Sequence, residues 1–518
     1  MSFMDRFHGR DQKIKGKLHR QLGKNITLLE EILKDSSDMI KKDFLCGTGK
    51  NLGAYIVYVD GMVNTDMIEE SILRPLLIKD IPTFTGTYQE KEEKIYDYVF
   101  KEVLEMADMR AATTMEDVVT QVLSGNTALL LDGSSKGIII SSRSFPSRGV
   151  QEADQEVAIW GPKDSFTEVL RSNTALIRRR IKDSRLKVKQ LTVGERSKTD
   201  VALMYVEDLI RPEILKEVEK KLDQVSMDGI LDSGMLEQLM VEEWNTPFPC
   251  FQRTQRPDKT ASALLEGRVV LVTDNSPNVI LLPGTFHTFF QASDEYYNRW
   301  ETASFARCLR YIAAFLAIGL PAFYVAVANF HTEVLPTALI LSFAQARQGI
   351  PFPIVVEVLI MELAFELLRE AGIRLPGQLG GTIGIVGGLI VGQAAVDAGI
   401  VSTIVVIVVA LTAIASFAIP NDAMTSAFRL LKFFFLFFAA FWGIYGFFLG
   451  WLFLVVHLSS LESFGQPYLR TDRWLEGEQK EKYKDYYLRM PLFWMKKRPV
   501  FTKKGARIRR KETEHGRK

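Results

Sequence analysis

The residues best suited to chemistry in this chain are four glutamates in an otherwise apolar stretch. The stretch runs from Ile350 to Gly399, and its carboxylates are Glu357, Glu362, Glu366 and Glu370. On a helix with 3.6 residues per turn the last three fall within an arc of about 80°, whereas Glu357 lies about 140° from Glu362. Such an acidic stripe either faces water or headgroups and pairs with Arg369 or Arg374 one turn away, or it faces an aqueous vestibule and attracts cations. The sequence leaves both interpretations open.

The second half of the same stretch is rich in glycine. Gly384, Gly388 and Gly392 form two consecutive small-xxx-small spacings, which let membrane helices approach closely. On an ideal helix another face carries Thr382, Val386, Leu389 and Gln393. This face has polar groups at both ends and an apolar waist, a pattern typical of a hydrophobic constriction that gates a pore. Tight packing against a neighbouring helix is the alternative interpretation.

These side chains must be positioned by membrane helices, and four segments are long and apolar enough, at about 309–328, 381–398, 401–419 and 430–456. We expect the glutamate segment, 354–371, to be interfacial, re-entrant or packed inside an assembly, because each charge at a bilayer centre costs about 2.5–3.5 kcal/mol. The N-terminus lacks an apolar signal region, and the C-terminal tail is strongly basic, so we expect both ends in the cytosol. Four crossings satisfy that arrangement.

The first 300 residues are charged throughout and predict a cytosolic α/β head of two similar subdomains, joined to the α-helical transmembrane domain. Each half has a strand, a helix and a later hairpin, with turns at Asp132-Gly133 and around Asp274-Asn275. The expected parts are a polar extension at 1–23, subdomains at 24–150 and 190–290, a basic helical connector at 151–189, a pre-membrane helix at 291–308, the transmembrane domain at 309–458 and the basic tail at 459–518. The connector is expected to be solvated or to face anionic lipid.

The sequence predicts no catalytic residues, no metal site and no cofactor, so we do not expect an enzyme. The stretch around Lys50 lacks the first glycine and the Ser/Thr of a phosphate-binding loop. Cys46, Cys250 and Cys308 are far apart, lack metal-ligand spacing and are expected to be structural thiols. A formal net charge of +2 gives no electrostatic case for a nucleic-acid partner.

The long stretches "PFPIVVEVLIMELAFELLREAGIRLP" and "GGTIGIVGGLIVGQAAVDAGIVS" closely resemble the A subunit of spore germinant receptors, the GerA family of spore germination proteins. "EWNTPFPCFQRTQRPDKTASALLEGRVVLVTDNSPNVILLPGTF" in the head and "HLSSLESFGQPYL" before the tail agree, so the resemblance covers about 24–470. The basic extension after about Asp472 is longer than the family pattern and its role is open.

The resemblance implies a multi-pass subunit of the spore inner membrane. Its partners would be a transporter-like B subunit that binds the nutrient and a lipoprotein C subunit. The A subunit would form a homo-oligomeric, ligand-gated ion channel whose opening triggers germination. The alternatives are a non-conducting signalling or scaffold subunit of the same receptor and, more remotely, a secondary transporter.

Overall fold

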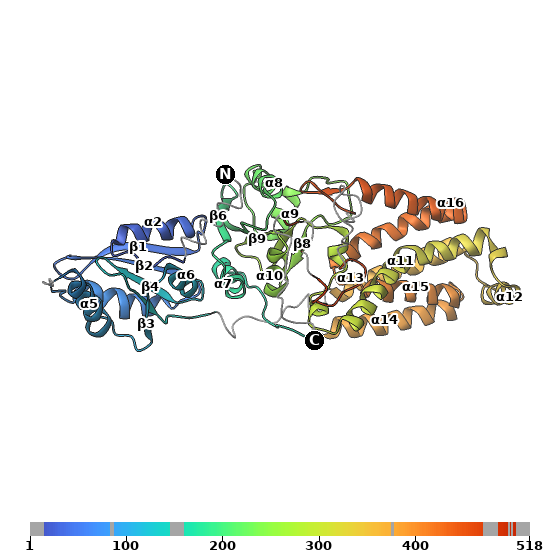
Figure 1. Ribbon diagram of the computed structural model, residues 1–518. Coiled ribbons are helices and arrows are strands. Elements are labelled where there is room, and N and C mark those ends of the chain that lie inside the picture. Colours follow the sequence, from blue (N-terminus) through green and yellow to red (C-terminus); the bar gives the residue numbers. More distant parts are fainter. Residues whose placement is uncertain are drawn as a thin grey trace, which may run out of the picture. The chain divides into compact units, whose positions relative to one another are not determined.

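The computed structural model describes residues 15–82, 87–145, 160–373, 378–469, 485–495, 498 and 501–503. The chain forms two compact units (Figure 1). Unit 1 comprises Met1–Val241, Phe251–Pro283 and Lys496–Lys518, and unit 2 comprises Glu242–Cys250 and Gly284–Met495. Unit 1 holds both large β-sheets, and unit 2 holds the long apolar helices.

The first sheet of unit 1 has the strand order β1-β2-β4-β5-β3, and all neighbouring strands are antiparallel. Its strands are β1 (Met39–Cys46), β2 (Leu52–Val59), β3 (Met109–Ala112), β4 (Thr127–Leu131) and β5 (Gly137–Ile140). Side chains alternate between the two faces, so Tyr55 and Val57 pack on one side while Ala54 and Ile56 pack on the other.

Helices cover both faces of this sheet (Figure 1). The face that carries Tyr55 packs against α2 (Leu22–Ile32) and α6 (Met115–Val122). The opposite face packs against a second set, which comprises α3 (Thr65–Ile68), the π-helix η1 (Glu69–Leu73), α4 (Arg74–Ile78), α5 (Tyr88–Tyr98) and the π-helix η2 (Val99–Val103). The sheet is therefore the middle of a three-layer arrangement.

The second sheet has the corresponding order β6-β7-β9-β10-β8, again with antiparallel neighbours. Its strands are β6 (Leu186–Val193), β7 (Thr199–Val206), β8 (Gln252–Thr254), β9 (Val269–Thr273) and β10 (Val279–Leu282). Its helices are α7 (Leu170–Arg180), α8 (Pro212–Asp223), α9 (Ser233–Met240) and α10 (Pro257–Leu265). Both predicted hairpins are present as β4–β5 and β9–β10, and Gly133 and Asn275 have the positive φ that their turns need.

The basic stretch expected as a connector is folded into the second core where it is described. Leu176 and Ile177 of α7 pack with the strands of the second sheet. Arg178 is fully buried and holds Asp38, which precedes β1, through bonds of 2.6 and 2.9 Å. Its Nη1 donates to the backbone oxygen of Leu186 at 2.9 Å. Arg178 therefore links the two sheets of unit 1 and is not available to a lipid surface.

Unit 2 is helical. Its main helices are α11 (Trp300–Phe330), α12 (Thr337–Ala346), α13 (Ile354–Ile373), α14 (Gln378–Asp397), α15 (Thr403–Phe417) and α16 (Asp422–Ser460). Short 3₁₀ turns η3 (Phe286–Phe290), η4 (Ser293–Tyr296) and η5 (Thr332–Val334) and the two-residue strands β11 (Glu462–Ser463) and β12 (Gln466–Pro467) complete it. Among the described helices, α11 and α16 are long and apolar enough to cross a membrane.

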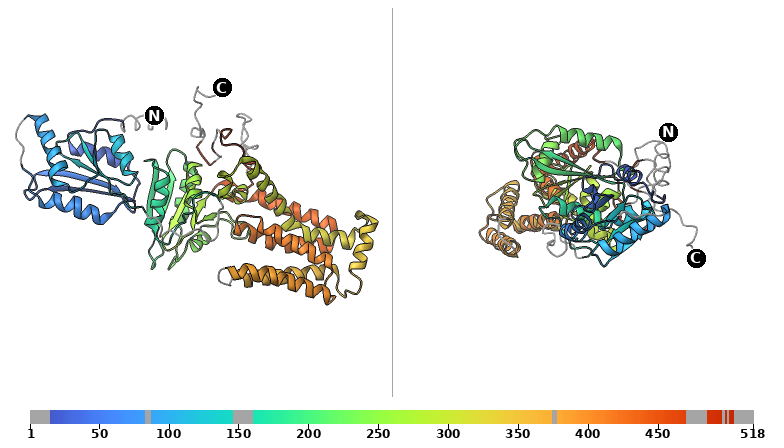
Figure 2. Two further views of the ribbon diagram at one scale, coloured as in Figure 1. Left: turned by 90° about the horizontal axis from the view of Figure 1, so that it is seen from below. Right: turned by 90° about the vertical axis from the view of Figure 1, so that its left-hand side faces the viewer.

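Helix α16 differs from the single helix expected at 430–456, because it is a hairpin of two arms (Figure 2). The Phe435 and Trp451 rings lie 5.1 Å apart, whereas sixteen residues of straight helix would separate them by about 24 Å. The chain reverses at Gly443, whose φ of 58° and ψ of −136° fall outside the helical region. A Cβ there would lie 2.9 Å from the Cβ of Phe330, so glycine is needed for both conformation and space. The arms are 422–442 and 444–460.

The buried pair in unit 1 gives a first prediction. Arg178→Met leaves the Asp38 carboxylate buried without its counter-charge, so we expect the free energy of unfolding to fall by about 3–5 kcal/mol. Urea unfolding of the full-length chain, followed by circular dichroism, measures the change. The control is Arg196→Met, which removes an exposed partner of Asp228 and should not alter the unfolding midpoint. Equal midpoints for both variants would contradict the assignment.

Candidate functional site

The candidate site is the group of glutamates on α13, which packs within unit 2. Ile354, Val358 and Met361 form the apolar face of α13, at the i, i+4 and i+7 spacing of a buried helix stripe. They pack among side chains of three other helical regions, including Tyr324 of α11, Val405 of α15 and Leu436 of α16. This apolar packing fixes α13 in place and so positions its charged side chains next to the neighbouring helices.

Glu357 lies at the N-terminus of α15. It is fully buried, and it accepts a hydrogen bond of 2.8 Å from the backbone N–H of Ser402, the residue that caps α15. Arg347 approaches its other oxygen at 3.3 Å. The unpaired N–H groups and the positive end of the helix dipole favour an anion at this position. Glu357 thus joins α13 to the start of α15.

Glu362 and Glu366 share one lysine from another helix. Lys432, in the first arm of α16, lies 2.5 Å from Glu362 and 2.9 Å from Glu366. Arg429, one turn earlier, lies 3.6 Å from Glu366. Two carboxylates therefore face two cations. Glu362 is only 2% exposed, and its Oε1 has no hydrogen-bond partner among the described residues.

The side chains of α13 differ in their exposure. Ile360 and Leu367, two apolar residues outside the acidic stripe, are 38% and 72% exposed. Glu370 is exposed, unlike Glu362. The ion pairs that hold Glu362 and Glu366 run to α16, not to the arginine one turn along α13; Arg369 lies over the Phe417 ring at 6.0 Å, and Arg374 falls outside the described residues.

Sequence reasoning missed the partners Arg347, Ser402, Arg429 and Lys432. A signal was present, because Lys432 is a single cation inside the apolar run "LLKFFFLFFAAF". An isolated charge in such a run needs a partner of opposite sign, and the glutamates of α13 were the available group. What the sequence could not supply was the pairing of α13 with α16.

The glycine-rich segment forms α14, as a helix at the expected position. A Cβ at Gly388 would lie 3.5 Å from Phe365 of α13, and one at Gly392 would lie 3.2 Å from Val406 of α15. These two glycines therefore allow close approach to neighbouring helices of the same chain. Gln393 is exposed and bonds Asp397 at 2.9 Å. The surroundings of Thr382, Gly384, Val386 and Leu389 lie outside the described residues.

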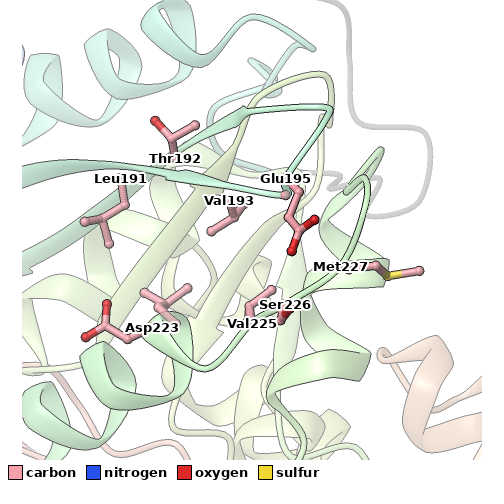
Figure 3. Close-up of a pocket in the computed structure, with 10 residues that line it drawn as sticks. Leu191, Thr192, Val193, Glu195, Asp223, Val225, Ser226 and Met227 are labelled. Atoms are coloured by element: carbon pink, nitrogen blue, oxygen red, sulfur yellow. The ribbon is translucent and has the colours of Figure 1, made fainter.

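A separate hollow lies in unit 1, with a volume of about 360 Å³ (Figure 3). Val193 at the end of β6 and Glu195 in the turn after it line the hollow on one side. Asp223 at the end of α8 and Ser226 and Met227 in the following loop line the other side. Two carboxylates and two hydroxyls, the latter from Thr192 and Ser226, lie among apolar groups, without an arrangement specific to one ligand. Across the described ranges, no three His, Cys, Asp or Glu residues are grouped to hold a metal ion.

Comparison with known proteins gives consistent matches. Residues 27–501 match the family described as "Bacillus/Clostridium GerA spore germination protein". The chain is 40% identical to "Uncharacterized membrane protein YfkQ" of Bacillus subtilis (strain 168), over 96% of this chain and 93% of that protein. It is 39% identical to "Spore germination protein KA" of the same organism, over 94% and 88%. The crystal structure of the N-terminal domain of the A subunit of the Bacillus megaterium spore germinant receptor GerK3 aligns with a TM-score of 0.41 and 29% identity, over 52% of this chain and 98% of that domain.

The shared lysine gives a second prediction. Lys432→Met leaves Glu362 buried without a cation, and we expect it to lower the thermal midpoint of the full-length chain in detergent, by the equivalent of about 3–5 kcal/mol. The matched control is Lys220→Met, because Lys220 is 61% exposed in its pair with Glu217 and should leave the midpoint unchanged. The assignment of Lys432 as the buried counter-ion is wrong if the two variants have the same thermal midpoint.

Proposed function

Since the chain belongs to the GerA family of spore germination proteins, we propose that it is the membrane A subunit of a nutrient germinant receptor in the spore inner membrane. The family match over 27–501 carries this proposal. Its partners are then a B subunit that binds the nutrient and a lipoprotein C subunit. The helical unit, with two helices long and apolar enough to cross a membrane among the described residues, is compatible with a membrane subunit.

We further propose six membrane passes, formed by α11, α13, α14, α15 and the two arms of α16. This differs from the four crossings expected from the sequence. The support is that α13 and α15 run side by side in the same direction, because Glu357 contacts Ser402 at one end and Arg369 contacts Phe417 at the other. A helix that accompanies α15 along its length spans the same layer. Six is also even, which keeps the head and the basic tail in the cytosol.

The charges on α13 are compatible with that placement. A charge within a membrane is tolerated when it faces the helix bundle and pairs with an opposite charge. Glu357 and Glu362 are buried and paired in this way, and the exposed positions Ile360 and Leu367 are apolar. The acidic stripe is therefore compatible with a crossing helix, and its described pairs favour a structural role over an open cation vestibule.

We propose that several copies assemble a channel around α14. One copy of a glycine-rich helix cannot enclose a pore, so conduction needs an oligomer. Val386 and Leu389 would form the apolar waist, with Thr382 and Gln393 above and below. The exposure of Gln393 and Ile390 supports a face that is free to meet other copies. The alternative is a non-conducting signalling or scaffold subunit, and a secondary transporter is a weaker one.

For the head we propose two similar subdomains that act as a binding or relay module. The equal strand order of the two sheets supports a shared fold. Their link through Arg178 and Asp38 supports movement as one body in response to the B subunit.

The gate position gives a third prediction. Val386→Ala widens the proposed waist and lowers its hydrophobicity, so the closed channel should leak. Purified variant in liposomes should pass potassium without nutrient faster than the unchanged chain does. Spores that carry it should germinate without nutrient, at normal receptor abundance. Val391→Ala is the matched control, because the same substitution lies about 140° away on α14.

Two results would decide against the gate. Slow germination with a reduced receptor level would mean that Val386 only packs against a neighbour. Equal potassium flux for Val386→Ala, Val391→Ala and the unchanged chain would favour the non-conducting subunit.

A further inference from the structure

Two joined segments of unit 2 present large apolar side chains to their surroundings. Six of these side chains, between 40% and 67% exposed, form what we name the interfacial patch: Trp300, Phe305, Tyr487, Leu492, Phe493 and Trp494. The first two belong to the start of α11, and the other four belong to the described part of the tail, 485–495. So much apolar surface on a fixed segment indicates that something covers it.

The tail segment is held firmly to the start of α11. Arg307 is fully buried and bonds Asp485 at 2.7 Å, while its Nε lies 2.9 Å from Glu295. The Tyr296 hydroxyl donates to the same Asp485 at 2.6 Å. One turn before Arg307, the Ser304 hydroxyl donates to the backbone oxygen of Arg489 at 2.7 Å. Two buried carboxylates around one arginine thus fix the segment in place.

Aromatic contacts continue this attachment towards the apolar part of α11. The Tyr487 ring lies 5.3 Å from Tyr311 of α11, and 5.1 Å from His287. Burial, with a smaller effect of Arg307, lowers the pKa of His287 to about 4. The imidazole is therefore neutral near pH 7 and adds no charge beside the patch. Phe493 and Trp494 pack edge to face at 5.7 Å, in a turn closed by the Trp494 N–H and the Pro491 oxygen.

The charge of the chain beyond this turn indicates which kind of surface could cover the interfacial patch. From Tyr486 to Lys511 the sequence has ten Lys or Arg residues and no Asp or Glu. Three of the ten are engaged within the protein, because Arg489 is buried and Arg498 and Lys503 donate to backbone oxygens of unit 1. The other seven supply the charge of this stretch. A second copy of this chain would bring two such basic stretches together, which is unfavourable. Aromatic side chains with neighbouring basic residues, at the point where an apolar helix begins, are typical of the boundary between a membrane and water.

We propose that the interfacial patch docks on the anionic lipid headgroups of the membrane that α11 enters. This inference rests on the proposed membrane location. It gives the basic extension a role. The aromatic turn enters the headgroup layer, and the basic residues of the extension other than Arg498 and Lys503 meet lipid phosphates. The Arg307–Asp485 pair then ties the docked turn to the start of α11.

A fluorophore at the turn tests the docking. Phe493→Cys is labelled with bimane in a chain that also carries Cys308→Ala, because Cys46 and Cys250 are buried and Cys308 is partly exposed. The full-length protein is reconstituted in vesicles of phosphatidylcholine alone or with added phosphatidylglycerol, each with a headgroup-attached nitroxide quencher. Quenching should be roughly twofold or more stronger with the anionic lipid. A label at Arg196→Cys, 84% exposed in unit 1, is the control and should not be quenched by lipid.

Each of the other possible results excludes a specific part of the docking proposal. Equal quenching in both vesicles would exclude recognition of anionic lipid. No quenching, in a chain that resists alkaline carbonate extraction, would overturn the docking while leaving the membrane subunit proposal intact. Protection from both the lipid quencher and aqueous iodide would mean that another protein surface covers the patch. Release of the chain by carbonate would instead overturn the proposed membrane location itself.

Discussion

The arrangement of unit 2 depends on Lys432 standing between two glutamates of α13. Removing a cation and two carboxylates from water is costly unless the opposite charges contact one another with good geometry. The pair at 2.5 Å and its neighbour at 2.9 Å therefore determine how α13 and the first arm of α16 align. Glu357 does the same for α13 and α15 through the Ser402 N–H. At these positions, the acidic residues of an otherwise apolar helix join that helix to its neighbours.

The glycine helix depends on that alignment. Gly388 faces Phe365 of α13, and Gly392 faces Val406 of α15, so α14 takes its position from the two helices that Glu357 joins. A change at the charged contacts would move α13, and with it the helix that we propose lines the pore. The same logic links the tail to α11 through Arg307. In both places a buried ion pair or charged hydrogen bond fixes one segment relative to a neighbouring helix.

Much of this arrangement was readable from local sequence. The α13 boundaries, the α14 helix and the hairpins β4–β5 and β9–β10 follow from apolar periodicity and turn residues, which act over a few positions. The reversal at Gly443 was not readable, since α16 is apolar on both sides of it and glycine is common in membrane helices. The burial of Arg178 was missed for a related reason. A run of three arginines resembles a solvated face until Asp38, 140 residues earlier, is placed beside it.

Glu362 and Lys432 stabilise unit 2 as a pair. The most direct measurement is a double-mutant cycle on the full-length chain, with Glu362→Gln, Lys432→Met and both together, read as the midpoint of thermal unfolding in detergent. If the two charges stabilise each other, the double variant should lose less stability than the sum of the losses in the two single variants. The difference should be about 1–3 kcal/mol. If the two losses simply add, Glu362 and Lys432 do not stabilise each other, and each charge is stabilised by a different group.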